Sequence, residues 1–493
     1  MTLIYLLVPV LLALFILLRS RTNLAAIAAL PLLLAFGRSA FIDTYGWVMI
    51  VGPVPLTIAD VIFGGLGAAW LYIRYRRRSS VPIRFTVEIS VMILLAVFIL
   101  IETTLTWLDG YRLVRVIQIT RTYLYLPLGF FVWIDIFRHI TESEANDFIG
   151  ILAALCLPLS ILYSASALGV RIYPYPAYLT VYVGQEILVR DFTTIPAFAS
   201  MALAFYLAQP KRDWRWATAT MIIMVGLLLT FTRSIVAGAL ACIAVALVNE
   251  FFKLARRATL IRGVIGAIII VAVGLGGFIV LEWISPEAFA YLSERLEQVQ
   301  AGGLEASSLV VRFDMLQGIN EALTQTSPVF GAGLVPYDQA DPTGMVYRAS
   351  WILGDIMWAS VLLYLGLAGV AVYGLMLVVA LWQSFRLGLE TATQDVRLGL
   401  FLFLFFAQSL ALSFTGEGFV TGASVAALPF ALLTVARQRA WAVNPVTIPL
   451  NQFFSGIHLR WFTQNDEYRW FRLGTLALAM IVIEVWIIQR LVR

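Results

Sequence analysis

Residues 355–382 read DIMWASVLLYLGLAGVAVYGLMLVVALW, and after Asp355 the chain carries no charged side chain until Arg386. An α-helix needs about 20 apolar residues to cross the hydrocarbon core of a bilayer, so this run is long enough to span it. Similar runs recur along the chain and predict about 12–14 membrane-spanning helices. The runs lie at 3–18, 23–37, 56–73, 86–104, 122–137, 148–168, 193–208, 217–232, 235–252, 263–283, 355–382, 398–414, 420–436 and 473–489.

The composition excludes a soluble globular fold. Hydrophobic residues make up 61% of the 493 residues and charged residues only 13%. Lipid can accept this much apolar surface, whereas water cannot. The sequence therefore predicts an all-α, polytopic transmembrane helical bundle. Cys156 and Cys242 each lie inside an apolar run and are predicted to pack there; the sequence has neither the ligand spacing of a zinc site nor a basic face for nucleic acid.

The basic residues predict the orientation of the chain. Most of the 34 Lys and Arg residues fall in alternate loops, including both lysines. Cytoplasmic loops carry an excess of Lys and Arg, so we place these loops in the cytoplasm and the N-terminus outside. Residues 1–283 then form the N-terminal transmembrane helices and residues 284–354 a large outer loop. Residues 355–493 form the C-terminal transmembrane helices, with a cytoplasmic interfacial segment at 437–472.

The cations predicted outside are all arginines, whose planar guanidinium groups suit the oxygens of phosphate. Arg233 stands out because it lies in TFTRS (230–234), where one predicted span ends and the next begins. A charge at the edge of the hydrocarbon is costly and is usually paired or functional. The alternative is ordinary loop charge or anchoring to lipid headgroups. The candidate phosphate-binding residues are Arg233, Arg312, Arg171, Arg190, Arg112 and Arg115.

The outer loop is predicted to fold into a helical cap, or alternatively into a surface helix at the membrane boundary. Pro286 favours a helix over 287–300, which Gly302 and Gly303 end. A second helix follows and stops near Ser327 and Pro328, before VFGAGL (329–334), whose glycines permit a tight turn and close backbone approach. The second helix has an apolar stripe with a period near 3.6, formed by Val310, Phe313, Leu316, Ile319 and Leu323, while Arg312, Asp314, Asn320 and Glu321 fall on other faces.

Asp355 is predicted to lie at the outer mouth of the span that follows the cap. An aspartate at a helix N-terminus is a good cap, so this carboxylate either caps the helix or acts as a functional group of the site. Four other acidic residues are predicted at the outer side and are alternatives to it. They are Glu102, Asp109, Asp341 and Glu417.

Taken in order, these features resemble the O-antigen ligase and O-antigen polymerase superfamily of bacterial surface-polysaccharide enzymes. TFTRS (230–234) is similar to the family's arginine–serine signature at an outer helix end. Arg312, the apolar helix and PVFGAG (328–333) resemble the family's arginine, helix and P-L-G-x-G pattern in its large periplasmic loop. Asp355 with LGLAG (365–369) looks like the start of the next helix. The motifs cover roughly residues 190–375, and the hydropathy pattern covers the whole chain.

The resemblance implies a GT-C-like fold in the bacterial cytoplasmic membrane, with its active site facing the periplasm. The implied donor is a glycan on undecaprenyl pyrophosphate, and the acceptor is a sugar hydroxyl. Guanidinium groups of Arg233 and Arg312 would stabilise the departing pyrophosphate, and Asp355 would accept the acceptor's proton. The implied reaction is a single inverting displacement with no metal or cofactor. A chain-length regulator is a further implied partner.

One departure from the family bears on the kind of enzyme. Ligases of the family usually carry a histidine where Asp355 stands, and the two histidines here, His139 and His458, are predicted in the cytoplasm. The expectation is therefore a polymerase of lipid-linked repeat units. The alternatives are a ligase that transfers finished glycan to a lipid core or protein, and a flippase without chemistry. Tyrosines in the loop at 169–196 would stack on sugars or belong to an interfacial aromatic belt; they are Tyr173, Tyr175, Tyr178 and Tyr182.

Overall fold

The structure is a computed structural model, and it describes the helical core of the chain. The described residues are 47–51, 54–57, 85–167, 180–183, 186–189, 194–209, 213–230, 233–256, 317–335, 357–390, 396–413 and 423–443, with short helical pieces between 66 and 75 and between 279 and 293. The predicted spans at 3–18, 23–37 and 473–489 and most of 263–283 lie outside these residues.

The described chain is mainly α-helical, as the sequence predicts. Each helix with described bounds overlaps a predicted apolar run, although α5 begins at Leu113, nine residues before the run predicted at 122–137. The helices are α4 (Val87–Leu108), α5 (Leu113–Arg138), α6 (Glu142–Ala167), α7 (Thr194–Ala208), α8 (Trp214–Leu228), α9 (Arg233–Arg256), α14 (Met357–Glu390), α15 (Val396–Ser413) and α17 (Ala423–Val443). Within the described residues, two stretches are long and apolar enough to cross a membrane: Val87–Leu108 and Met357–Gly388.

Side-chain caps define where several helices begin. Thr86 precedes α4, and its hydroxyl accepts a hydrogen bond from the Ile89 amide. Asp213 caps α8 in the same way through the Trp216 amide, at 2.9 Å. Thr141 and Glu144 form a reciprocal capping box before α6. Such caps satisfy amide groups that have no partner inside the helix, so they fix the first turn.

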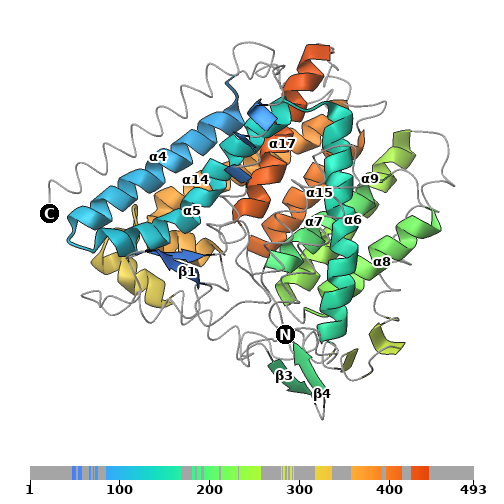
Figure 1. Cartoon of the computed structure of the whole chain (residues 1–493), viewed down its shortest axis with the longest axis horizontal. Coiled ribbons are helices and arrows are strands. Elements are labelled where there is room, and N and C mark those ends of the chain that lie inside the picture. Colours follow the sequence, from blue (N-terminus) through green and yellow to red (C-terminus); the bar gives the residue numbers. More distant parts are fainter. Residues whose placement is uncertain are drawn as a thin grey trace.

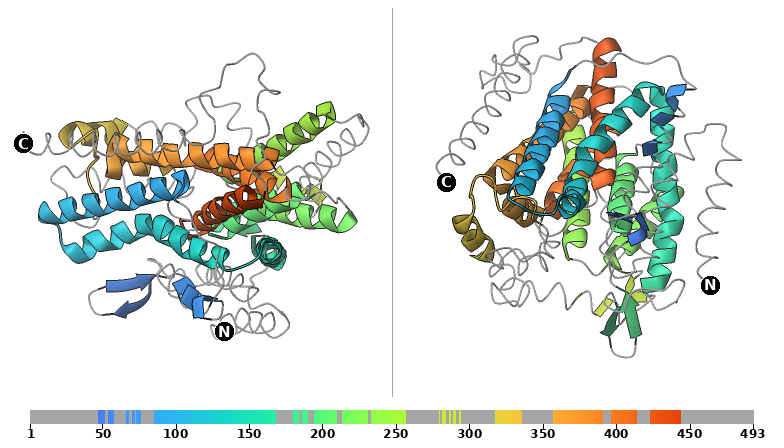
Figure 2. Two further views of the ribbon diagram at one scale, coloured as in Figure 1. Left: turned by 90° about the horizontal axis from the view of Figure 1, so that it is seen from above. Right: turned by 60° about the vertical axis from the view of Figure 1, so that its left-hand side comes forward.

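The helices pack as two groups with α15 between them (Figures 1 and 2). In the first group, α4 lies against α5 and α14, and α17 lies along α5. In the second group, α7 contacts α6, α8 and α9. Helix α15 contacts α14 of the first group and both α7 and α9 of the second. Aromatic side chains fill these contacts: the ring centroids of Phe406 and Phe430 are 4.6 Å apart, and those of Phe205 and Phe401 are 6.1 Å apart.

Two β-hairpins interrupt the helical pattern, and the sequence analysis did not predict them. Strand β1 (Trp47–Val51) pairs antiparallel with β2 (Val54–Thr57), and β3 (Thr180–Val183) pairs antiparallel with β4 (Glu186–Val189). The start of the predicted span 56–73 is wrong, because Leu56 and Thr57 belong to β2. Valine and threonine favour strands, and a short apolar run does not distinguish a strand from a helix.

The last part of the predicted cap helix is confirmed. Residues 317–325 are helical and end just before Ser327 and Pro328. Ile319 and Leu323 of the predicted apolar stripe are buried, whereas Asn320 and Glu321 are exposed. The earlier part of the cap, with Arg312, lies outside the described residues.

Candidate functional site

The loop Ser327–Val335 joins a break in helix α14. The backbone of α14 leaves the helical conformation at Gly366, which has φ 62° and ψ −163°. The amides of Leu367 and Ala368 then donate to the carbonyls of Pro328 and Val329, at 3.0 and 2.9 Å. The Ala332 amide donates in return to the Leu363 carbonyl, at 2.7 Å. The loop therefore replaces hydrogen bonds that the interrupted helix cannot make itself.

Glycines make this backbone contact possible, as the sequence predicts. Gly331 and Gly333 have positive φ values of 76° and 82°. A Cβ on Gly331 would lie 2.6 Å from the Leu363 carbonyl oxygen, and one on Gly366 would collide with the Val329 carbonyl. The glycines of PVFGAG and LGLAG therefore act as a matched pair that lets two backbones touch.

Thr106 ties the same loop to helix α4. Its hydroxyl accepts a hydrogen bond from the Leu334 amide at 2.9 Å and donates to the Glu102 carbonyl at 2.8 Å. A Cβ on Gly333 would lie 2.7 Å from this hydroxyl. We call this end of the bundle the cap end; it holds the loop Ser327–Val335 and the connection between α4 and α5, beside the gold helical segment 317–325 (Figure 1).

Two predicted phosphate-binding arginines lie at the cap end. Arg112 is the residue before α5, its side chain is exposed, and it makes no side-chain capping bond. Arg115 is half-buried in the first turn of α5, and its Nη1 donates to Gln118 Oε1 at 3.2 Å. Both follow the tight connection at Gly110, whose φ is 95°.

The last turns of α15 lie between the starts of α9 and α14. On one side, Trp358 Nε1 in the first turn of α14 donates to the Ser413 hydroxyl at 2.9 Å. On the other side, a Cβ added to Gly238 in α9 would lie 2.9 Å from Leu412 Cγ and 3.3 Å from Gln408 Cγ. Helix α9 begins at Arg233, and α14 begins two residues after Asp355 in the sequence. The structure thus places the start of α9, where Arg233 lies, and the start of α14 on either side of the end of α15.

The predicted site residues are described to different extents. Arg233 is the first residue of α9, and its side chain lies outside the described part of the structure. Among the alternative carboxylates, Glu102 is buried in α4 and Asp109 is exposed just after it. The remaining predicted residues lie outside the described residues: Asp355, Arg312, Arg171, Arg190, Tyr173, Tyr178, Asp341 and Glu417. In the described ranges, no three His, Cys, Asp or Glu side chains are grouped so that they could hold a metal ion.

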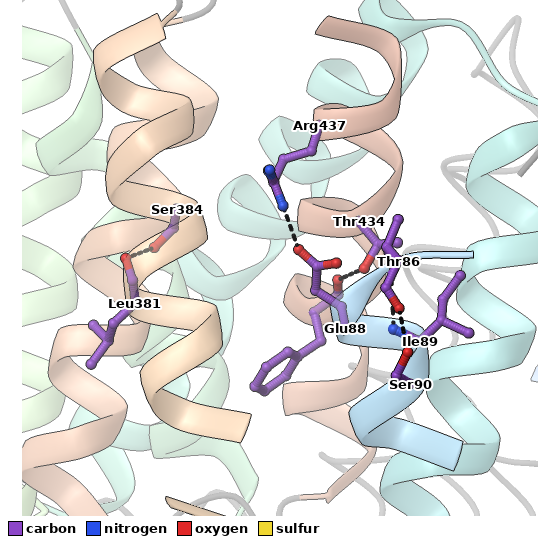
Figure 3. Close-up of polar contacts among 9 residues, drawn as sticks. Thr86, Glu88, Ile89, Ser90, Leu381, Ser384, Thr434 and Arg437 are labelled. Carbon is purple, nitrogen blue, oxygen red and sulfur yellow. Dashed lines mark hydrogen bonds and ion pairs between the residues drawn. The ribbon is translucent and has the colours of Figure 1, made fainter. Parts of the chain in front are cut away.

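The structure also shows a buried ion pair at the opposite end, which the sequence analysis missed. Arg437 Nη1 of α17 donates to Glu88 Oε1 of α4 at 2.9 Å, and both residues are at most 4% exposed (Figure 3). The sequence analysis placed Arg437 in an interfacial segment, but α17 continues to Val443. Glu88 is the only charged residue in the apolar run before Glu102, and this isolated charge was the signal that could have revealed the pair.

A second set of polar contacts lies beside this pair. The Arg439 guanidinium donates to the carbonyls of Phe137, at 2.9 Å, and Ile140, at the end of α5. Asp135 accepts from Trp70 Nε1 at 2.5 Å and pairs with Arg138 at 2.6 Å. We call this end of the bundle, where α4 begins and α5 and α17 end, the base end.

Comparison of the chain with models of protein families and with curated protein sequences finds no match. The functional assignment therefore depends on the residues and geometry described above.

Proposed function

We propose that the protein is a multi-pass membrane glycosyltransferase that polymerises lipid-linked oligosaccharide repeat units at the outer face of the bacterial cytoplasmic membrane. The donor is a glycan on undecaprenyl pyrophosphate, and the acceptor is a hydroxyl of another repeat unit. The observation that carries the proposal is the position of the α15 end between the start of α9, with Arg233, and the start of α14, which follows Asp355.

The reaction is a single displacement at the anomeric carbon. The acceptor hydroxyl oxygen forms a bond to that carbon, and the bond from the carbon to the phosphate oxygen breaks. The electron pair leaves with the pyrophosphate, and the hydroxyl proton passes to the Asp355 carboxylate. Guanidinium groups of Arg233 and Arg312 stabilise the charge on the leaving pyrophosphate. A single displacement inverts the anomeric configuration.

Two features of the cap end support this assignment. Arg112 and Arg115 place positive charge at the same end of the bundle as the loop Ser327–Val335. The loop Ser327–Val335 is tied to α14 and α4 by backbone and hydroxyl hydrogen bonds, so this part of the cap is held in a defined place. Catalysis by positioned charges needs such a rigid support, because the charges must already face the site when the bond breaks.

The test is a reaction with purified components. The full chain in lipid nanodiscs is incubated with an undecaprenyl-pyrophosphate oligosaccharide, and the products are separated by size. A ladder of products identifies a polymerase, and a single transfer to another acceptor identifies a ligase. In a parallel experiment the full chain is reconstituted in closed lipid vesicles, where movement of the lipid-linked glycan across the membrane without any product identifies a flippase and overturns the proposal.

A further inference from the structure

Gln408 of α15 is a buried amide whose hydrogen-bonding groups are unpaired within the part of the chain that the structure describes. Its side chain is 1% exposed, and neither Nε2 nor Oε1 has a hydrogen-bond partner among the residues that the structure describes. An amide left in this condition destabilises a folded protein, and buried polar groups are normally paired. Keeping the Gln408 amide unpaired lowers the stability of the ligand-free fold. We therefore expect Gln408 to have a role that appears only when a ligand is bound.

The position of Gln408 places it at the proposed site. Its Cγ faces Gly238 of α9, five residues and about 7–8 Å along the helix axis from Arg233. Five residues further along α15, Ser413 accepts the hydrogen bond from Trp358 at the start of α14. Gln408 thus lies on the helix that separates the start of α9 from the start of α14, close to the end of the bundle at which both helices begin.

The packing of α15 shows which neighbouring helices lie beside Gln408. Phe401 lies two helical turns before Gln408 and so on the same face of α15. Its ring contacts Phe205 of α7, with centroids 6.1 Å apart. Gln408 therefore lies where α15 packs against both α7 and α9. Gly238 keeps this contact close, because any side chain there would meet Leu412 and Gln408.

The chemistry of the amide points to the class of group that it binds. Its NH₂ donates and its carbonyl oxygen accepts, so one partner satisfies both only if it also donates and accepts. A sugar hydroxyl does this, whereas a pyrophosphate offers acceptors alone. We propose that Gln408 is a specificity-determining residue that hydrogen-bonds a hydroxyl of the donor's sugar. This inference rests on the proposed function.

The matched control is Gln383 in α14. Gln383 is also buried, at 8% exposure, and its Oε1 has no hydrogen-bond partner within the described residues. It lies far along α14 from Trp358, towards the base end. Gln383→Leu therefore removes the same chemical group from a similar environment outside the proposed site. Comparison with Gln408→Leu separates an effect on sugar recognition from a general effect of removing a buried amide.

The experiment measures initial rates and thermal unfolding of both variants in nanodiscs. Gln408→Leu should raise KM for the lipid-linked oligosaccharide about 10-fold, the loss expected for one well-placed hydrogen bond, while Gln383→Leu leaves KM unchanged. Without ligand, Gln408→Leu should unfold at the same temperature as the native chain or about 1–3 °C higher, because an unpaired amide has been removed. The lipid-linked oligosaccharide should stabilise the native chain more than Gln408→Leu, and undecaprenyl pyrophosphate without sugar should stabilise both equally.

Two contrary results would distinguish failure of the inference about Gln408 from failure of the proposed function. An unchanged KM together with a lower unfolding temperature in Gln408→Leu would show that Gln408 has a structural role, and would overturn this inference while leaving the polymerase intact. A native chain that forms no product, and whose unfolding temperature responds to neither lipid, would overturn the proposed function and this inference together.

Discussion

The two ends of the bundle handle polar groups in different ways. At the base end, charged side chains are paired: Arg437 of α17 with Glu88 of α4, and Arg138 with Asp135 within α5. At the cap end, the loop Ser327–Val335 is held by hydrogen bonds of backbone amides and of the Thr106 hydroxyl, and the amide of Gln408 is not paired within the described residues. Among the described residues, paired charges therefore fasten helices at the base end, whereas hydrogen bonds fasten the loop Ser327–Val335 at the cap end.

This difference follows from the energetics of burial. A buried charge without its partner costs several kcal/mol, so paired charges fasten helices only where both partners stay in place. A backbone loop held by hydrogen bonds positions side chains without using their charge. The comparison predicts that changes at the base end alter stability and leave turnover per folded molecule unchanged, while changes at the cap end alter turnover.

The largest expected effect is at the base end. Arg437→Met leaves the Glu88 carboxylate buried without its guanidinium and should destabilise the fold by about 3–5 kcal/mol. The double variant Arg437→Met with Glu88→Met should recover most of this loss, because a buried ion pair can be replaced by apolar side chains. Thermal unfolding of the native chain and of both variants in nanodiscs measures the effect. Loss of polymerisation by the stable double variant would break the proposed division between the two ends.

The next largest effect is expected for Arg233→Ala, and it should fall on the reaction rate rather than on stability. Removing one guanidinium that stabilises the leaving pyrophosphate should lower kcat about 100- to 1000-fold, while the unfolding temperature stays near that of the native chain. The control is Arg256→Ala, at the other end of the same helix α9, which should keep full activity. Normal chain extension by Arg233→Ala would remove this residue from the mechanism.

The next effect tests whether the loop and the broken helix form one unit. Gly366→Ala places a Cβ against the Val329 carbonyl and forces a backbone conformation that is nearly restricted to glycine, at a cost of about 3 kcal/mol. The cap should then detach, and both the unfolding temperature and the polymerisation rate should fall. Gly374→Ala is the matched control, since a Cβ there meets nothing within 4 Å. Similar behaviour of the two variants would show that the loop does not depend on its contact with α14.

Local sequence patterns predicted the parts of the molecule that depend on local physics. The apolar run at 355–382 predicted α14, and the period of the cap helix predicted that Ile319 and Leu323 are buried. The glycines of VFGAGL predicted close backbone approach, although nothing in the sequence identified Leu363 of α14 as the partner.

Contacts between distant parts of the chain account for what was missed. Glu88 and Arg437 are 349 residues apart. In the sequence, an arginine that pairs with so distant a glutamate looks the same as an arginine in a loop. The break at Gly366 has the same origin, because its stabilising carbonyls come from a separate loop. The two hairpins were missed because hydrophobicity alone does not separate short strands from helices.

The smallest expected effect sharpens the comparison by testing one bond of the cap end. Thr106→Val keeps the shape of the side chain and removes the acceptor for the Leu334 amide, which should cost about 1–2 kcal/mol. Thr104→Val is the matched control, because its hydroxyl is exposed and bonds only to the carbonyl of its own helix at Leu100. If Thr106 positions the cap over the site, Thr106→Val should lower the polymerisation rate more than its small loss of stability explains, and added substrate should not restore the rate. A rate equal to that of Thr104→Val would mean that α14 alone holds the cap, and that the contact with α4 contributes only to packing.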